Sequence, residues 1–221
     1  MKDTLHLAAA LLLCAMLPCA CNNSTWTKEE KGLIDGNGCM RVLTLEDRTD
    51  SLLLRQPCLD FTEGDLRDEC YSILAERMVA TVTDPSQDGV GIAGPQVGLL
   101  RRIVAVQRFD KEGEPFEVYP NIRITALRGP QELGREGCLS VPAAFVPQEG
   151  ALPADDVSGT STDPEVEPSS YGMVMRYRDI DIAYTSPLTL CDTAETVTGF
   201  TAVIFQHECD HLDGILFIDR L

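Results

Sequence analysis

The stretch Gln206-His207-Glu208-Cys209-Asp210-His211-Leu212-Asp213-Gly214 places two histidines four residues apart, with a glutamate directly after the first. On an α-helix, residues at i and i+4 share a face, so both imidazoles can bind one ion while Glu208 lies beside it as a proton carrier. Cys209 lies about 200° from His207 around such a helix, which predicts a packing role for this cysteine. The stretch therefore predicts a helix that carries half of a metal site.

The remaining ligand of this site has to come from another part of the chain. A divalent metal used for hydrolysis takes three protein ligands and keeps one position open for water. The chain has three histidines in all, and the third, His6, lies near the N-terminus. Phe217 stands where the metalloprotease pattern H-E-x-x-H-x-x-G-x-x-H requires its last histidine, which excludes that class of protease. We therefore expect the third ligand upstream of the helix.

The N-terminal residues 1–21 are typical of a secretory signal. Lys2 precedes an apolar run over residues 7–17, and small residues and cysteines follow. This run is too short to span the roughly 30 Å hydrocarbon core of a bilayer as a helix. Cleavage before Cys21 would resemble a bacterial lipoprotein site, which predicts an exported protein attached to a membrane through lipid on Cys21. The alternative is a cytoplasmic enzyme that starts at Met40.

The rest of the chain divides into a short polar stretch and one domain. Residues 22–39 are polar and contain glycine, which predicts a tether, and residues 40–221 are long enough for a single domain with a hydrophobic core. Within this domain, residues 148–172 contain acidic side chains but no Lys or Arg, which predicts a surface insertion. The formal net charge of −17 argues against a nucleic-acid surface, because phosphate binding requires clustered Lys and Arg.

Periodicity predicts one long helix and several short strands. A capping box at Thr62–Asp65 followed by apolar residues at helical spacing predicts an amphipathic helix over 64–82. Short β-rich runs broken by Gly, Pro and Asp predict a small, mostly antiparallel or mixed sheet. These runs are residues 102–107, 116–119, 122–127, 173–175 and 180–184.

Three further features bear on the metal helix. Phe200, Val203 and Ile204 precede His207 by seven, four and three positions, so they share its face as a pocket wall or as a core stripe. In the stretch 89–96, small residues let backbone approach a ligand closely, and Gln96 offers an amide donor. In the stretch 136–140, Cys138 stands in a tight polar loop. Taken singly, a glycine-rich stretch is more often only a turn, and a lone cysteine is more often a buried packing residue than a ligand.

Together, the histidine helix and these two stretches resemble the three signature motifs of the peptide deformylase family, in the family's order and at similar separations. The resemblance covers most of the chain from about Met40 to Leu221. It implies an α+β fold with small antiparallel or mixed sheets around a central metal-binding helix. It also implies that Cys138, His207 and His211 bind one divalent metal ion, Fe(II) or Zn(II), a choice that a cysteine with two histidines does not decide.

The activity implied by the resemblance is hydrolysis of the formyl group on the N-terminal methionine of peptides, in a monomer, with release of formate. The metal would activate a bound water, and Glu208 would accept its proton and pass it to the leaving amine. The Gln96 amide and the backbone N–H of Leu139 would hold the oxyanion. By analogy with the family, the methionine side chain or the floor of the site would be formed by Val90, Gly91, Ile92, Glu136, Phe200, Val203 and Ile204.

Two alternative functions remain at this point. The predicted export and the acidic insertion favour a metalloamidase or peptidase that uses the same site on another acyl group. A catalytically silent peptide-binding relative would keep only the fold. The joint presence of the residues needed for catalysis argues against the silent relative, because a binding protein would need none of them; these residues are Gln96, Cys138, His207, Glu208 and His211.

Overall fold

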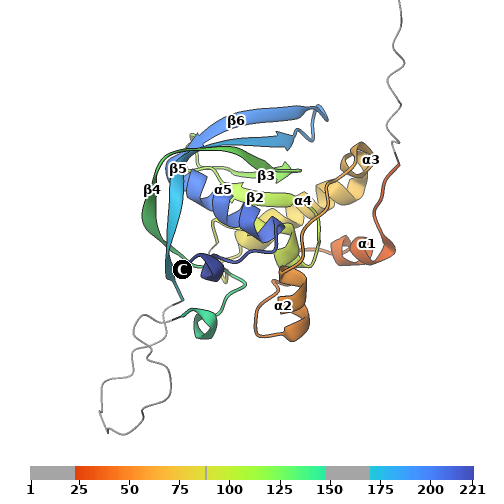
Figure 1. The fold of residues 1–221 in the computed structure, drawn as a ribbon. Helices are drawn as coiled ribbons and strands as arrows, with labels where there is room; N and C mark the ends of the chain where they lie inside the picture. Colours follow the sequence, from red (N-terminus) through yellow and green to blue (C-terminus); the bar gives the residue numbers. More distant parts are fainter. Residues whose placement is uncertain (1–22, 88, 148–169) are drawn as a thin grey trace, which may run out of the picture.

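The computed structural model describes residues 23–87, 89–147 and 170–221 (Figure 1). The predicted signal at 1–21, with Cys21, lies outside these residues, and so does most of the acidic insertion predicted for 148–172. The predicted insertion extends too far at its C-terminal end, because Gly172 is the first residue of a strand and pairs with Glu136. In the described part of the chain, no helix is long and apolar enough to cross a membrane.

Two three-stranded antiparallel sheets form the β part of the fold. The first has the order β1-β2-β3 and consists of β1 (Gly91–Ala93), β2 (Ile103–Gln107) and β3 (Phe116–Pro120). The second has the order β4-β5-β6 and consists of β4 (Arg123–Glu136), β5 (Gly172–Thr185) and β6 (Asp192–Thr198).

Helix α5 (Gly199–Leu212) runs through the centre of the molecule and contacts strands of both sheets (Figure 1). Every residue from Thr201 to Leu212 is buried, so the polar side chains of this helix need partners inside the protein. Gln206 meets this requirement by accepting from the backbone N–H of Tyr177 at 3.1 Å and donating to its carbonyl oxygen at 2.7 Å. These two bonds fix α5 against β5. The predicted α+β fold, with small antiparallel sheets around a central helix, is confirmed.

The long helix predicted over 64–82 is interrupted. The chain forms α3 (Glu63–Arg67) and α4 (Glu69–Val82), with Asp68 in an extended conformation between them. The Asp68 carboxylate accepts from the backbone N–H of Cys70 at 3.0 Å and thereby caps the second helix. Asp at an N-cap position competes with continued helix, because its short side chain bonds nearby backbone donors. The apolar spacing alone did not reveal this second cap.

The strands agree with the predicted runs in position but differ in length. β2 and β3 correspond to the runs at 102–107 and 116–119, and the run at 122–127 is the first part of β4. The separate runs at 173–175 and 180–184 belong to one strand, β5, because ion pairs accommodate the intervening Arg176, Arg178 and Asp179. β1 and the polar β6 had no apolar run to indicate them.

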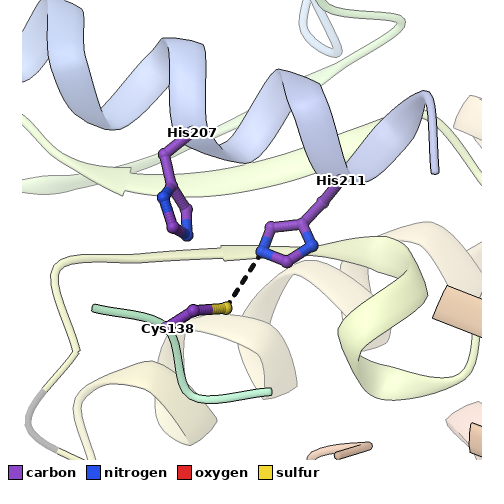
Figure 2. A group of neighbouring side chains, drawn as sticks. All are labelled: Cys138, His207 and His211. Atoms are coloured by element: carbon purple, nitrogen blue, oxygen red, sulfur yellow. Dashed lines mark hydrogen bonds between the residues drawn. The ribbon is translucent and has the colours of Figure 1, made fainter. Parts of the chain in front are cut away.

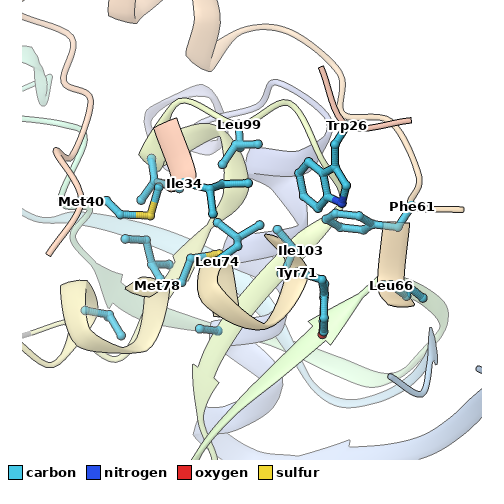
Figure 3. Packing of buried hydrophobic residues seen from close by; sticks show 14 residues of the cluster. Trp26, Ile34, Met40, Phe61, Leu66, Tyr71, Leu74, Met78, Leu99 and Ile103 are labelled. Atoms are coloured by element: carbon cyan, nitrogen blue, oxygen red, sulfur yellow. The ribbon is translucent and has the colours of Figure 1, made fainter. Parts of the chain in front are cut away.

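The N-terminal stretch is part of the folded domain, so the tether predicted for 22–39 is wrong for residues 23–39. Helix α1 (Lys28–Ile34) begins with a capping box between Thr27 and Glu30. Trp26 and Ile34 are 8% and 1% exposed and join the core that α4 and β2 share (Figure 3). Burial of these two large apolar side chains holds the polar stretch against the domain, because their surface is removed from water.

Arg101 fastens this N-terminal stretch to the domain. Its guanidinium lies 5.1 Å from the Trp26 ring and donates to both carboxylate oxygens of Glu30 at 2.6 and 2.9 Å. The same group donates to Thr25 Oγ1 and to the Thr25 carbonyl oxygen. Asp65 accepts from the Thr25 hydroxyl at 2.9 Å. The stretch is therefore held by charge-assisted hydrogen bonds as well as by apolar packing.

Four short helices complete the fold around the C-terminal half of α5 and the loop that follows β4. They are α2 (Arg48–Leu54), η1 (Gly94–Val97), η2 (Ala143–Phe145) and η3 (Phe217–Arg220). A small apolar cluster joins this loop to β5 and η3, and Cys138 packs against it. Its buried members are Val141, Val146, Val174, Leu216 and Phe217.

Replacement of Trp26 tests whether the N-terminal stretch contributes to stability. We expect Trp26→Ala to lower the free energy of unfolding by about 3 kcal/mol, because it removes a large buried side chain and the ring beneath Arg101. Urea unfolding of the two proteins measures the difference. Leu188→Ala is the control, because Leu188 is 94% exposed and its loss should change the free energy by less than about 0.5 kcal/mol. Equal midpoints for Trp26→Ala and the parent protein would restore the tether interpretation.

Candidate active site

Helix α5 and the loop after β4 bring one cysteine and two histidines together, as Figure 2 shows. The ligand atoms of Cys138, His207 and His211 all lie within 4.8 Å of one another. Cys138 Sγ is 3.2 Å from His211 Nε2, and the two imidazole centres are 5.1 Å apart. The i, i+4 spacing on the helix produces the histidine pair, as predicted. The loop brings the cysteine to it from about seventy residues upstream.

The surroundings of His207 show that this cluster fits a metal ion. His207 Nδ1 lies 2.9 Å from Glu136 Oε2. Burial by itself raises the pKa of Glu136, but hydrogen bonds from His207 and Arg176 outweigh it and lower that pKa to about 2. An ionised carboxylate only accepts hydrogen bonds, so Nδ1 carries the proton and Nε2 keeps its lone pair for a metal. One sulfur and two imidazole nitrogens are suitable ligands for zinc or iron.

Glu136 is the end of a buried chain of ion pairs behind the metal ligands. Arg176 donates to its two carboxylate oxygens at 2.7 and 3.0 Å and to Asp210 Oδ2 at 2.6 Å. Arg220 donates to both oxygens of Asp210 from the other side. Glu136, Arg176 and Asp210 are each at most 9% exposed. The chain therefore connects β4, β5, α5 and η3 and fixes the orientation of the His207 ring.

Sequence reasoning missed most of this ion-pair chain. Asp210 lies three positions after His207, so helical spacing placed it next to the metal ligands, and that was the one available signal. Arg220 comes ten residues after Asp210, beyond the end of the helix, and no local pattern connects them. Arg176 is 40 residues from Glu136 and 34 from Asp210, so its partners could not be read from the sequence.

Glu208 lies in the same cavity as His207 and is almost removed from water. It is 3% exposed, and its Oε2 has no hydrogen-bond partner among the described residues. Burial raises the pKa of Glu208 to about 7. A carboxyl group with a pKa near neutrality can both accept and return a proton, which is what a general base that later acts as an acid must do.

A glycine opposite Glu208 leaves room for its carboxylate. A Cβ atom at Gly91 would lie 2.5 Å from Glu208 Oε1 and 2.8 Å from Ile204 Cγ2, so any larger residue would displace the carboxylate. This geometry gives a specific reason for the small residues in the stretch 89–96. Gly91 lets strand β1 approach α5 at the point where the Glu208 carboxylate lies.

Gln96 and Leu139 lie beside Cys138 and line the same cavity. Gln96 Oε1 accepts from the backbone N–H of Ala93 at 2.8 Å, so its amide nitrogen is the atom that faces the site. That nitrogen lies 3.3 Å from Ser140 Oγ and 3.5 Å from Cys138 Sγ. Within the described residues, the backbone N–H of Leu139 makes no hydrogen bond. Both donors can therefore bind an oxygen atom placed at the ligand cluster.

Comparison with known proteins agrees with this geometry. The sequence model of the polypeptide deformylase family matches residues 39–149 and 165–221. The chain belongs to the peptide deformylase family. A peptide deformylase of Leptospira biflexa is 30% identical over 178 residues, which cover 76% of this chain and 82% of the relative. One of Desulforudis audaxviator is 35% identical over 147 residues, covering 66% of this chain and 76% of the relative.

Solved deformylase structures share the fold. The crystal structure of the peptide deformylase from Thermotoga maritima aligns with a TM-score of 0.61 and 27% identity, covering 84% of this chain and 99% of that one. A class I type b peptide deformylase from Acinetobacter baumannii, with Met-Ala-Ser bound, aligns with a TM-score of 0.62 and 26% identity, covering 83% and 100%. The family removes the N-formyl group from nascent peptides and uses a divalent metal.

The deformylase site opens into a cavity of about 350 Å³. Most of the predicted pocket residues line it, namely Val90, Gly91, Glu136, Phe200, Val203 and Ile204, and so do Gln96 and Leu139. The prediction for Ile92 is wrong, because this side chain is fully buried in the core that contains Trp26. Successive residues of a strand face opposite sides, so Gly91 on the cavity side places Ile92 on the core side. The mouth also contains Gln87, Arg135, Ser170 and Tyr171, which sequence reasoning missed.

Loss of the Glu136 charge tests the role of the ion-pair chain. We expect Glu136→Gln to weaken metal binding by about 10- to 100-fold, because His207 loses the carboxylate that fixes its ring and its tautomer. Competition against a chelator measures the affinity, and circular dichroism checks that the variant is folded. Glu132→Gln on the same strand is the matched control, because Glu132 is exposed and, among the described residues, forms its ion pair with Arg178 and none with the site. An unchanged affinity in folded Glu136→Gln would show that the pairing does not support the site.

Proposed function

We infer that this chain is a metal-dependent hydrolase that removes the formyl group from the N-terminal formylmethionine of peptides and releases formate. The observation that carries this inference is the meeting of Cys138, His207 and His211 in one cluster, with the buried Glu208 beside them. Family membership agrees with it. All of these groups come from one chain, which favours a monomer as the active form.

Cys138, His207 and His211 would hold one divalent ion, Fe(II) or Zn(II). Such an ion supplies Lewis acidity for the formyl oxygen and for an attacking water. Glu208 accepts the proton of that water, which its position beside His207 and its raised pKa allow. After the C–N bond breaks, Glu208 returns the proton to the leaving amine of methionine.

The negative charge that develops on the formyl oxygen needs donors that are already in place. The Gln96 amide is oriented by its bond to the Ala93 N–H, and the Leu139 N–H has no acceptor among the residues that the structure describes. Preorganised donors of this kind favour the transition state because they need no reorientation when the charge forms. We propose that Gln96 and Leu139 together form the oxyanion site.

The methionine side chain of the substrate would occupy the apolar wall of the cavity. Val203 and Ile204 lie one helical turn before His207 on α5, and Val90, directly before β1, lines the same cavity. Phe200 closes the wall near the mouth and contacts Phe109, with ring centres 5.4 Å apart. A flexible thioether side chain packs well against aliphatic and aromatic groups of this kind.

Turnover of a formyl peptide tests this proposal. The full chain, loaded with Fe(II) under exclusion of oxygen or with Zn(II), should release formate from formyl-Met-Ala-Ser. Glu208→Ala should keep the metal and lose at least about 100-fold in turnover, the lower range for general acid–base catalysis. Cys138→Ala should lose the metal. No formate release from the metal-loaded chain would contradict the proposal, and release of acetate from acetyl-Met-Ala-Ser at an equal rate would favour an amidase of broader specificity.

We propose that the chain is exported and attached to a membrane through lipid on Cys21. The support is the order of Lys2, the apolar run at 7–17 and the cysteine, together with a domain that begins directly after this segment. Growth with a labelled fatty acid should label the parent chain and not Cys21→Ser. Equal labelling of both proteins, or a cytoplasmic product that starts at Met40, would contradict the location.

A further inference from the structure

Arg135 lies at the mouth of the active-site cavity, on strand β4 three residues before Cys138. Its guanidinium carbon is 4.4 Å from the centre of the Tyr171 ring, a cation–π contact. The ring rests on the backbone at Gly137, where a Cβ atom would lie 2.9 Å from two of its carbons. Gly137 therefore allows Tyr171 to pack on the strand, and Tyr171 holds the Arg135 side chain beside the cavity.

Within the described part of the chain, the charge of Arg135 has no carboxylate partner. Among the described residues, no carboxylate lies within 4.0 Å of its guanidinium, whereas Arg128 on the same strand pairs with Asp179 and Asp181. Arg176, a second cationic side chain near the cavity, forms ion pairs with Glu136 and Asp210. A tyrosine ring orients a guanidinium without neutralising it. In a chain of formal net charge −17, a cation at the substrate entrance that has no carboxylate partner among residues 23–87, 89–147 and 170–221 favours an anionic group there.

The position of Arg135 relative to the ligand cluster defines which part of a substrate it reaches. Three residues of extended chain separate it from Cys138, which corresponds to about 10 Å. A formyl peptide in an extended conformation, with its formyl group at the ligand cluster, covers a similar distance by its second or third residue. The groups within reach are therefore the side chain and the carboxylate of these residues, beyond the methionine.

We propose that Arg135, held on Tyr171, binds a carboxylate of the substrate and directs the enzyme toward formyl peptides with a negative charge on the second or third residue. This carboxylate is either an acidic side chain or the C-terminus of a short peptide. The proposal rests on the deformylase function proposed above. Arg135 acts on substrate choice and takes no part in the hydrolysis.

Four formyl peptides measured on the full metal-loaded chain test this proposal. Formyl-Met-Ala-Gln amide is the neutral reference, formyl-Met-Ala-Glu amide carries a side-chain carboxylate, formyl-Met-Ala-Gln acid carries a C-terminal carboxylate, and formyl-Met-Ala-Lys amide carries the opposite charge. We expect kcat/KM for at least one of the two anionic peptides to exceed the reference by about two- to fivefold, the range of an exposed ion pair. The excess should fall as salt is raised.

Variants assign the effect to Arg135. Arg135→Gln should bring the anionic peptides to the level of the reference, and Arg135→Glu should prefer the lysine peptide, with the neutral peptide cleaved as before in both. Tyr171→Leu should reduce the preference, because the guanidinium loses the ring that holds it. Arg128→Gln, which changes the net charge equally on the same strand, should keep the parent preference.

The outcomes separate this proposal from the deformylase function itself. Equal kcat/KM for all four peptides in the parent chain, or a preference that persists in Arg135→Gln, would overturn the role of Arg135 while leaving deformylation intact. Failure of the parent chain to cleave any of the four formyl peptides would overturn both. A preference that is lost in Arg128→Gln as well would overturn the proposal, because net charge and not the position of Arg135 would then account for it.

Discussion

The hydrogen bond between His207 and Glu136 is the interaction on which the site depends. It fixes the proton on Nδ1 and so leaves Nε2 for a metal, and it works only while Glu136 stays ionised in a buried position. A buried carboxylate is stable there because Arg176 supplies the opposite charge and two hydrogen bonds. Arg176 in turn is shared with Asp210. Residues of β4, β5, α5 and η3 thus hold one imidazole ring in its orientation.

The same burial that requires this ion-pair chain also prepares Glu208 for catalysis. Helix α5 contacts both sheets, so a carboxyl group on it is removed from water. Its charged form is then stable only if a partner is provided. Glu136 and Asp210 have arginine partners, whereas Glu208 faces the cavity beside Gly91. The three carboxylates around His207 therefore differ in role because they differ in partners. Two of them are structural anions, and the third is the proton carrier that we propose.

The sequence predicted the parts of the site that obey a local period. Helical spacing placed His207, His211 and Glu208 together, but only the family resemblance assigned Cys138, because no period connects a loop with a helix so far downstream. The prediction for Ile92 was wrong because the whole glycine-rich stretch was assigned to the cavity. Successive side chains of a strand face opposite sides, so only alternate residues of β1 can face it. The docked Trp26 and the break at Asp68 depended on tertiary partners and on a cap. The ion-pair chain depended on contacts between distant residues.

The central claim is that one cysteine sulfur and two imidazole nitrogens of this chain bind a single divalent ion. X-ray absorption spectroscopy of the full chain loaded with one equivalent of Zn(II) tests it most directly. The account predicts one sulfur neighbour at about 2.3 Å and two imidazole nitrogens at about 2.0–2.1 Å, with one further light-atom ligand. A spectrum with only nitrogen and oxygen neighbours, or with two or more sulfurs, would contradict it.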